Sequence, residues 1–184
     1  MVSQIFKIML GVISGTIFMV PPLLALNIGN DLTIFNKSPR LVDVVTTLSR
    51  IRVDGATYYF TIELPTNIGE SLQQLTIQQS QGLDRIYFYL DDTIAFEGKP
   101  LEQENNLNIA RVKRDLDNNK ISVIFEPPIP PGKTFTIALK PKINPEISGN
   151  YQFAITAYPA GKNAQGLYLG LGRLNFNQKG DRFP

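Results

Sequence analysis

The sequence contains no His, no Cys and no Trp among its 184 residues, and its methionines are Met1, Met9 and Met19. Without His, neither a Ser-His-Asp nor a Cys-His catalytic arrangement can form. No G-x-S-x-G or S-x-x-K stretch supplies another type of activated serine. Zinc, copper and haem sites that depend on imidazole, thiolate or thioether ligands lack those ligands after the first 25 residues. The sequence therefore predicts a protein that is not an enzyme and has no cofactor.

Charge of one sign is also scarce, because 18 Lys and Arg stand against 16 Asp and Glu, a formal net charge of +2. Nucleic-acid binding requires a concentrated basic face, so no nucleic-acid partner is expected. Basic residues are nevertheless enriched after position 126, where seven Lys or Arg are accompanied by Glu146 and Asp181. This excess is compatible with a solvated basic edge or with a patch for acidic polymers or anionic lipid headgroups.

The first 26 residues resemble an export signal. Lys7 precedes an uncharged run that begins at Ile8, and Pro21-Pro22 and the small residue Ala25 follow. We expect residues 1–25 to be a signal peptide cleaved after Ala25, and residues 26–184 to form the exported domain in the periplasm, cell envelope or extracellular space. The alternative is an uncleaved membrane anchor, because the uncharged run through Leu26 is 19 residues long and a span needs roughly 20.

Alternation of apolar and polar residues dominates the rest of the chain. In the stretch ATYYFTIELP, Tyr58, Phe60, Ile62 and Leu64 alternate with more polar residues, which is typical of a half-buried strand. The same pattern recurs around residues 75–77, 86–90, 121–125, 135–139, 151–157 and 166–176, with turn residues between most of the runs. The prediction is an all-β fold, a single antiparallel β-sandwich with an immunoglobulin-like two-sheet architecture.

Two stretches are harder to interpret. Leu41, Val44, Val45 and Leu48 have helical spacing, but the many β-branched residues there favour extended structure, so we expect a strand. In IFEPPIPPGKTFTIALKP, residues 124–141, we expect the prolines to end a strand at Phe125. The turn at residues 130–132 would then carry the chain to the other sheet.

A weak calcium motif occurs in DLDNNKISVIFE. Asp115, Asp117, Asn119 and Glu126 occupy liganding positions of an EF-hand loop. However, Lys120 replaces the glycine that the loop requires, and the residues from 121 to 125 alternate as a strand. We expect a β-hairpin with a polar tip, with calcium binding as an alternative.

Two further stretches contain residue types that occur in enzyme sites. Asp91 or Asp92 together with Glu97 could in principle serve as the two carboxylates of a glycosidase. The stretch GLGRLN at residues 170–175 lacks the third glycine and the helix of a dinucleotide-binding loop, so it is interpreted as a bent strand.

The stretch TAYPAGKNAQGLYLGLGR, residues 156–173, is the best candidate for a binding surface. It combines aromatic and cationic groups around a glycine-containing loop, and such groups can hold a sugar ring or an anionic polymer. The candidate binding residues are Tyr158, Lys162, Asn163, Tyr168 and Arg173. The alternative is that both tyrosines pack at a sheet edge while the loop simply closes a hairpin.

Four segments in order carry a family resemblance: SPR at 38–40, GATYYFTIELP at 55–65, FEPPIPPGKTFTIALKP at 125–141 and GNYQFAITAYPAGKNAQGLYLGLGRLNF at 149–176. Together they resemble a cyanobacterial family of exported proteins, domain of unknown function 2808. The resemblance implies a cyanobacterial source, an export signal and a β-rich domain. It implies no activity, cofactor or catalytic residue.

The leading functional hypothesis is an exported, non-enzymatic binding or structural module whose partner is an envelope polysaccharide, an anionic surface or an envelope protein. Two alternatives stay open. One is a carboxylate-dependent glycan hydrolase, and the other is a calcium-stabilised polysaccharide-binding module.

Overall fold

The computed structural model describes residues 32–178, which form nine β-strands and no helix. Accordingly, this part of the chain has no helix long and apolar enough to cross a membrane. The strands are β1 (Arg40–Thr46), β2 (Tyr58–Glu63), β3 (Leu72–Gln81), β4 (Phe88–Glu97), β5 (Ile109–Asp115), β6 (Lys120–Ile129), β7 (Thr134–Pro141), β8 (Gly149–Pro159) and β9 (Leu167–Phe176).

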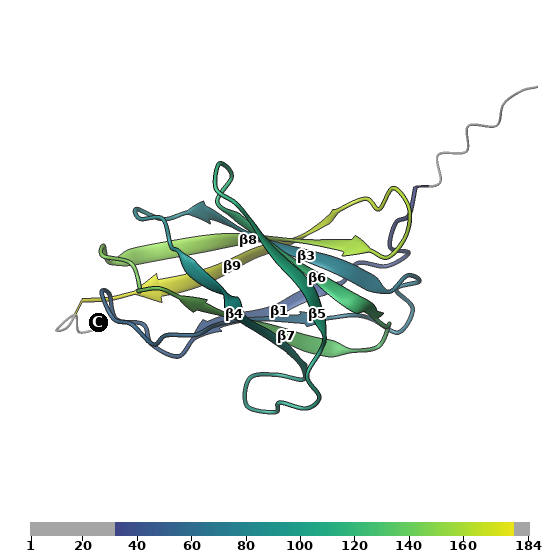
Figure 1. Ribbon diagram of the computed structural model, residues 1–184, viewed down its shortest axis with the longest axis horizontal. Helices are drawn as coiled ribbons and strands as arrows, with labels where there is room; N and C mark the ends of the chain where they lie inside the picture. Colours follow the sequence, from purple (N-terminus) through teal and green to yellow (C-terminus); the bar gives the residue numbers. More distant parts are fainter. Residues whose placement is uncertain (1–31, 179–184) are drawn as a thin grey trace, which may run out of the picture.

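The strands form two antiparallel sheets that pack face to face (Figure 1). The four-stranded sheet has the order β1-β2-β7-β4, and the five-stranded sheet has the order β5-β6-β3-β8-β9. The predicted all-β sandwich is therefore confirmed.

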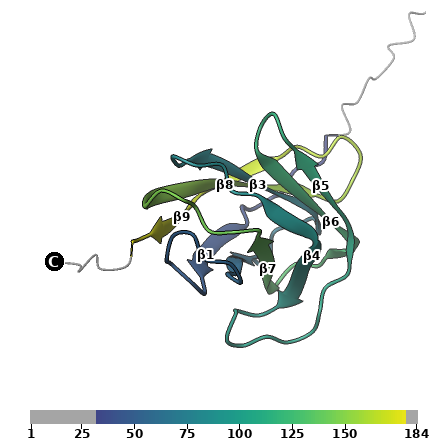
Figure 2. The same ribbon diagram turned by 60° about the vertical axis from the view of Figure 1, so that its left-hand side comes forward.

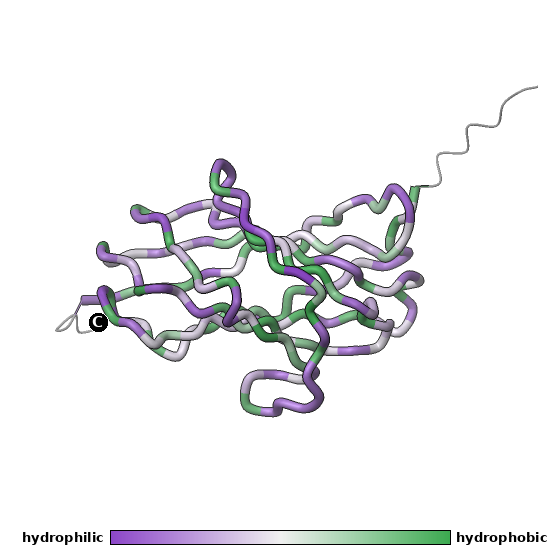
Figure 3. Tube along the Cα trace, in the orientation of Figure 1, coloured by the Kyte–Doolittle hydropathy of each residue, from purple (hydrophilic) through white to green (hydrophobic). Residues whose placement is uncertain are grey.

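The core lies between the two sheets and consists of the apolar residues that alternate along the strands. Tyr58, Phe60 and Ile62 of β2 are fully buried there. Aromatic rings from opposite sheets meet edge to face, with centroids 5.6 Å apart for Phe60 and Phe153 and 5.7 Å apart for Phe125 and Phe135. Figure 3 shows hydrophobic residues concentrated where the sheets overlap and hydrophilic residues along most loops.

The segment with helical spacing is a strand, as expected. The register of β1 against β2 is irregular between Leu41 and Asp43, which is the signature of a β-bulge. Leu41 packs against the core and Val44 is buried, whereas Val45 is more than a third exposed. The extra residue of the bulge places residues three apart on one face, which explains the misleading spacing.

The predicted end of the strand at Phe125 is wrong, because β6 continues through Pro127 and Pro128 to Ile129. Neighbouring β5 begins at Ile109, which pairs with Phe125. Prolines beyond Phe125 therefore remove no hydrogen bond from the ladder with β5. The predicted crossing is confirmed, because β6 belongs to the five-stranded sheet and β7 to the four-stranded sheet.

The sandwich has two loop-bearing ends (Figure 1). The N-terminal end, at the right, carries loops 64–71, 130–133 and 160–166, and Thr33 pairs with Ala164 there, whereas loop 98–108 projects at the bottom of the view. The C-terminal end, at the left, carries loops 47–57, 82–87 and 142–148, and Arg50 pairs with Asn177 there, whereas the hairpin loop 116–119 projects at the top of the view.

The edges of β1, β9 and the C-terminal part of β4 are covered by neighbouring segments. β1 lies beside β9 (Figure 2), and Gly172 of β9 allows this approach because a Cβ there would overlap Val44. The edge of β4 is covered by the loop before β5, where Leu107 N donates to Ala95 O over 2.8 Å. Covered edges are one way in which β-proteins avoid pairing with other chains.

Candidate functional site

The solvent-facing side of the five-stranded sheet, called the outer face below, is a broad polar surface. Alternation places the apolar residues of these strands inward and leaves mainly amides, hydroxyls, cations and two tyrosines outside. Its members are Arg111, Lys113, Asp115, Lys120, Ser122, Ile124, Gln74, Thr76, Gln78, Gln152, Ala154, Thr156, Tyr158, Tyr168, Leu171, Arg173 and Asn175.

One row of paired residues crosses the whole outer face. It runs from Lys113 through Ser122, Thr76 and Thr156 to Tyr168, one residue from each strand. Since neighbouring strands are about 4.8 Å apart, the row is about 19 Å long. It places a cation at one edge of the sheet and an aromatic ring, whose residue is 56% exposed, at the other.

The charge of the outer face is mainly positive. Arg111, Lys113 and Arg173 are exposed and make no ion pair within residues 32–178. Asp115 is already engaged, because its Oδ2 lies 3.6 Å from Lys120 Nζ. The face therefore offers three uncommitted cations to an anionic partner.

The structure brings together three of the five predicted binding residues. Tyr158, Tyr168 and Arg173 share the outer face, with Tyr168 opposite Thr156. Arg173 pairs with Gln152, which precedes Thr156 by four residues on β8. At strand spacing Arg173 therefore lies about 14 Å from Tyr168 along the sheet.

Lys162 and Asn163 lie apart from these three, in the turn at the N-terminal end. Thr33 Oγ1 donates to Lys162 O over 2.8 Å, and Asn163 has a positive φ of 51°. Tyr158 is only half-buried and packs over Gly166, at which a Cβ would lie 2.6 Å from the tyrosine ring. The hairpin alternative thus describes the loop, whereas the two tyrosines are available on the sheet surface.

The calcium motif forms the hairpin that the strand pattern predicts, between β5 and β6. Asp115 caps its turn, because Oδ1 accepts from Asn118 N over 3.1 Å and Oδ2 accepts from Asn118 Nδ2 over 2.7 Å. These bonds lower the pKa of the Asp115 carboxyl. Within residues 32–178, no group of three or more His, Cys, Asp or Glu side chains is close enough to hold a metal ion.

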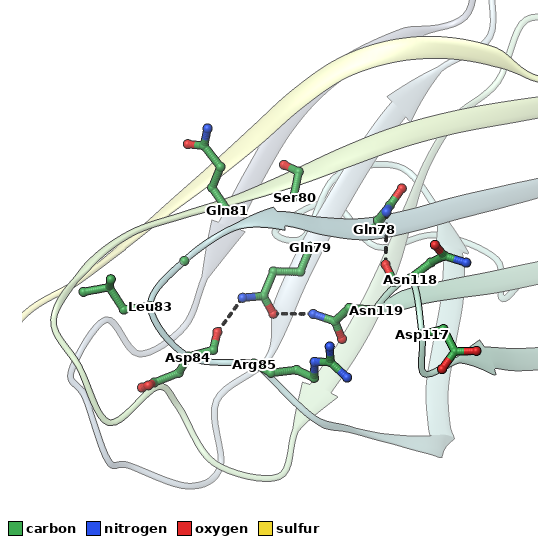
Figure 4. A pocket seen from close by; sticks show the side chains of 11 residues that line it. Gln78, Gln79, Ser80, Gln81, Leu83, Asp84, Arg85, Asp117, Asn118 and Asn119 are labelled. Carbon is green, nitrogen blue, oxygen red and sulfur yellow. Dashed lines mark hydrogen bonds between the residues drawn. The ribbon is translucent and has the colours of Figure 1, made fainter.

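A polar cavity of about 370 Å³ separates this hairpin from the β3–β4 loop (Figure 4). Gln79 connects its walls, because its Oε1 accepts from Asn119 Nδ2 over 2.9 Å and its Nε2 donates to Asp84 O over 2.6 Å. Arg85 also lines the cavity, beside the predicted metal ligands Asp117 and Asn119. Its fixed positive charge opposes the binding of a calcium ion there.

The carboxylates considered for glycoside hydrolysis do not form a catalytic pair. Asp91 and Asp92 are exposed on β4, and Asp92 lies 3.5 Å from Lys140 Nζ. Glu97 ends the same strand opposite Phe135, which is five residues, about 17 Å, from Lys140 along β7. The required separation is roughly 5 to 9.5 Å. Moreover, a hydrogen bond from Lys133, whose Nζ lies 3.0 Å from Glu97 Oε1, lowers the pKa of Glu97, whereas a general acid needs a raised pKa.

Sequence reasoning missed Arg111 and Lys113. β5 has few apolar residues, since Val112 is flanked by charges and Arg114 occupies a core-facing position. The one sequence signal for this strand was the alternation of the charged residues Arg111, Lys113 and Asp115 before a hairpin turn. A pattern of charges alone does not predict a strand, and β5 becomes recognisable as one through its pairing with β6.

Comparisons with solved structures return β-domains with low sequence identity. The collagen-binding domain of a Staphylococcus aureus adhesin is 16% identical with a TM-score of 0.37, covering 72% of this chain and 95% of that one. The full-length major pilin SpaD of Corynebacterium diphtheriae is 12% identical with a TM-score of 0.48, covering 75% of this chain and 34% of that one. The C-terminal domain of the Streptococcus agalactiae AgI/II polypeptide BspA is 11% identical with a TM-score of 0.44, covering 75% and 49%.

The aligned region thus spans about a third of the SpaD pilin and half of the BspA domain. Comparison with functionally curated proteins gives no match. The sequence model described as "Protein of unknown function (DUF2808)" matches residues 32–176, a range that contains all nine strands. The chain therefore belongs to the DUF2808 family.

Proposed function

We propose that this protein is an exported, non-enzymatic binding module that holds an acidic polysaccharide on the outer face of its five-stranded sheet. The observation that carries the proposal is the combination of Tyr158 and Tyr168 with three uncommitted cations on one face. Tyrosine rings present an apolar surface and a polar hydroxyl, which suits the faces of sugar rings. The cations supply attraction to the carboxylates or sulfates of the polymer.

Export rests on the N-terminal sequence pattern, with its charged start, uncharged run and small residue at Ala25. Asp91 and Asp92 lie too far from Glu97 to act together as a catalytic pair, which favours binding over turnover. The outer face is the solvent-facing side of a five-stranded sheet, and such a surface suits an extended polymer better than a small molecule, because small-molecule sites are concave.

The test is retention of the purified chain on an immobilised acidic polysaccharide, with a neutral polysaccharide as reference. We expect binding to the acidic polymer that weakens between about 0.05 and 0.3 M salt, because exposed charges are screened over about 10 Å at 0.1 M. Replacing both Arg111 and Lys113 by Gln should weaken retention severalfold. Tyr168→Ala should also weaken retention on the acidic polymer, because it removes the exposed ring at the edge of the outer face.

The matched control is the double variant Lys37→Gln and Lys99→Gln, which removes the same charge from exposed positions outside the outer face. If this control weakens retention as much as the double variant on β5, the attraction depends on net charge and the outer face is not the site. If no acidic polysaccharide retains the chain at low salt, the proposed function is wrong.

A further inference from the structure

A second cavity, of about 530 Å³, lies at the C-terminal end of the sandwich, away from the outer face. Ile86 and Tyr87, just before β4, line one side of it, and residues 142–146, just after β7, line the other. Asp84 and Arg85 separate it from the polar cavity, and their side chains leave the backbone in different directions (Figure 4). Cavities of about 300 to 1,000 Å³ are the size that small ligands occupy.

The walls of this cavity are held in place by hydrogen bonds before any ligand arrives. Lys142 N donates to Tyr87 O over 2.7 Å, which joins the two sides. Asp84 Oδ2 accepts from Glu146 N and Ile147 N over 2.7 and 2.9 Å. Asn144 is fully buried and bonds to Tyr58. A ligand would therefore pay little for ordering the site.

One cation lies over the ring of Tyr87 and another lies near the ring of Tyr89. The Arg114 guanidinium lies over the Tyr87 ring, 4.5 Å from its centroid, and Lys142 Nζ lies 5.7 Å from the centroid of Tyr89. Arg85, Arg114 and Lys142 make no ion pair within residues 32–178. Burial lowers the pKa of the Arg114 guanidinium, Tyr87 opposes this by raising it, and Arg85 adds a smaller lowering.

Apolar surface and acceptor oxygens complete the lining. Tyr87 is 45% exposed and Ile143 is 49% exposed, so both present apolar area to the cavity. The acidic residues there are Asp84, one of whose oxygens already accepts two N–H groups, and the exposed Glu146. The cavity thus offers cations, an aromatic ring and hydroxyl acceptors within one small space.

We propose that this cavity binds the carboxylate-bearing ring of a uronate sugar. Lys142 would hold the carboxylate, Tyr87 and Ile143 would cover the apolar face of the ring, and oxygens of Asp84 and Glu146 would accept its hydroxyl groups, whereas the Arg85 guanidinium donates to Leu116 O on the side of the polar cavity. A neutral sugar leaves Lys142 without an ionic partner, and a simple inorganic anion leaves the apolar walls unused. This site is separate from the outer face and does not depend on the proposed function.

The experiment is an amide NMR titration of the purified chain with trigalacturonate, with maltotriose and inorganic phosphate as the neutral and purely anionic probes. Trigalacturonate should shift the amide signals of residues 84–87 and 142–146 at lower concentration than either other probe. Lys142→Gln should weaken binding about tenfold, as expected for loss of one charge-assisted hydrogen bond. Tyr87→Leu, which keeps apolar volume but removes the ring, should weaken it severalfold.

Lys140→Gln is the matched control, because Lys140 lies two residues away on β7, pairs with Asp92 over 3.5 Å and does not line the cavity. It should bind trigalacturonate like the unchanged chain. The Arg111→Gln and Lys113→Gln double variant should also retain these shifts, which separates this site from the outer face. Equal binding of maltotriose or phosphate, an unaffected Lys142→Gln variant, or no shifts at these residues would each overturn the proposal.

Discussion

At the scale of single residues, the stability of the C-terminal end depends on one buried amide. Asn144 is fully buried, and its Nδ2 donates to Leu48 O and Arg50 O over 2.9 and 2.8 Å. Its Oδ1 accepts from Tyr58 OH over 2.7 Å. One side chain therefore connects the loop after β7 to the loop after β1 and to the core.

We expect Asn144→Ala to lower the free energy of unfolding by about 3 kcal/mol, because buried groups that lose their partner cost about 1–3 kcal/mol each. The measurement is urea unfolding followed by tyrosine fluorescence. Asn175→Ala, at an exposed position on β9, is the control and should change stability by less than about 0.5 kcal/mol. An unchanged urea midpoint for Asn144→Ala would show that water replaces the amide without loss.

At the scale of elements, the seam between β1 and β9 joins the two sheets on one side of the sandwich. Gly172 is buried on β9, and a Cβ at this position would overlap Val44 Cγ2 and lie 2.8 Å from Val44 Cβ. The need for glycine here is a matter of space, since the φ of Gly172 lies outside the left-handed region. Packed interiors tolerate added atoms poorly.

We predict that Gly172→Ala destabilises the chain by about 1–3 kcal/mol through overpacking at this seam. Thermal or urea unfolding measures the loss, and hydrogen exchange should show that protection falls first in β1. Combining Gly172→Ala with Val44→Ala removes the clashing side chain and should recover part of the stability. If the double variant loses more unfolding free energy than the sum of the losses in the two single variants, the clash is not the cause.

At the scale of the whole molecule, two core tyrosines make stability depend on alkaline pH. Burial, with a smaller contribution from Tyr151, raises the pKa of Tyr58, and burial likewise raises the pKa of Tyr151. Unfolded tyrosines ionise near pH 10. Above that pH the unfolded chain releases protons that the folded chain retains, so the stabilising contribution is complete below about pH 10 and declines as pH rises further.

We therefore expect the urea midpoint to fall between about pH 9.5 and 11. Tyr58→Phe should be less stable than the unchanged chain at neutral pH, because Asn144 loses a donor, but its stability should decline less steeply with pH. The slope, rather than the absolute stability, is the diagnostic quantity. Equal slopes for the two chains would contradict the assignment to Tyr58.

The sequence alone determined the fold class and most strands. Alternating residues such as Tyr58, Phe60 and Ile62 can bury one face only as a strand, and that local rule needs no knowledge of the partner. The hairpin at residues 115–120 and the crossing between β6 and β7 followed from turn chemistry in the same way. The family, too, was recognisable from ordered segments of sequence.

Only the tertiary structure decided which surfaces exist. The bulge in β1, the continuation of β6 through its prolines and the strand character of β5 depend on neighbouring strands that lie far away in sequence. The same is true of Arg111 and Lys113 on the outer face with Tyr168, and of Lys142 and Arg85 beside Tyr87. Periodicity fixes which side of a strand a residue occupies, but strand order and register, which long-range pairing sets, fix what lies next to it.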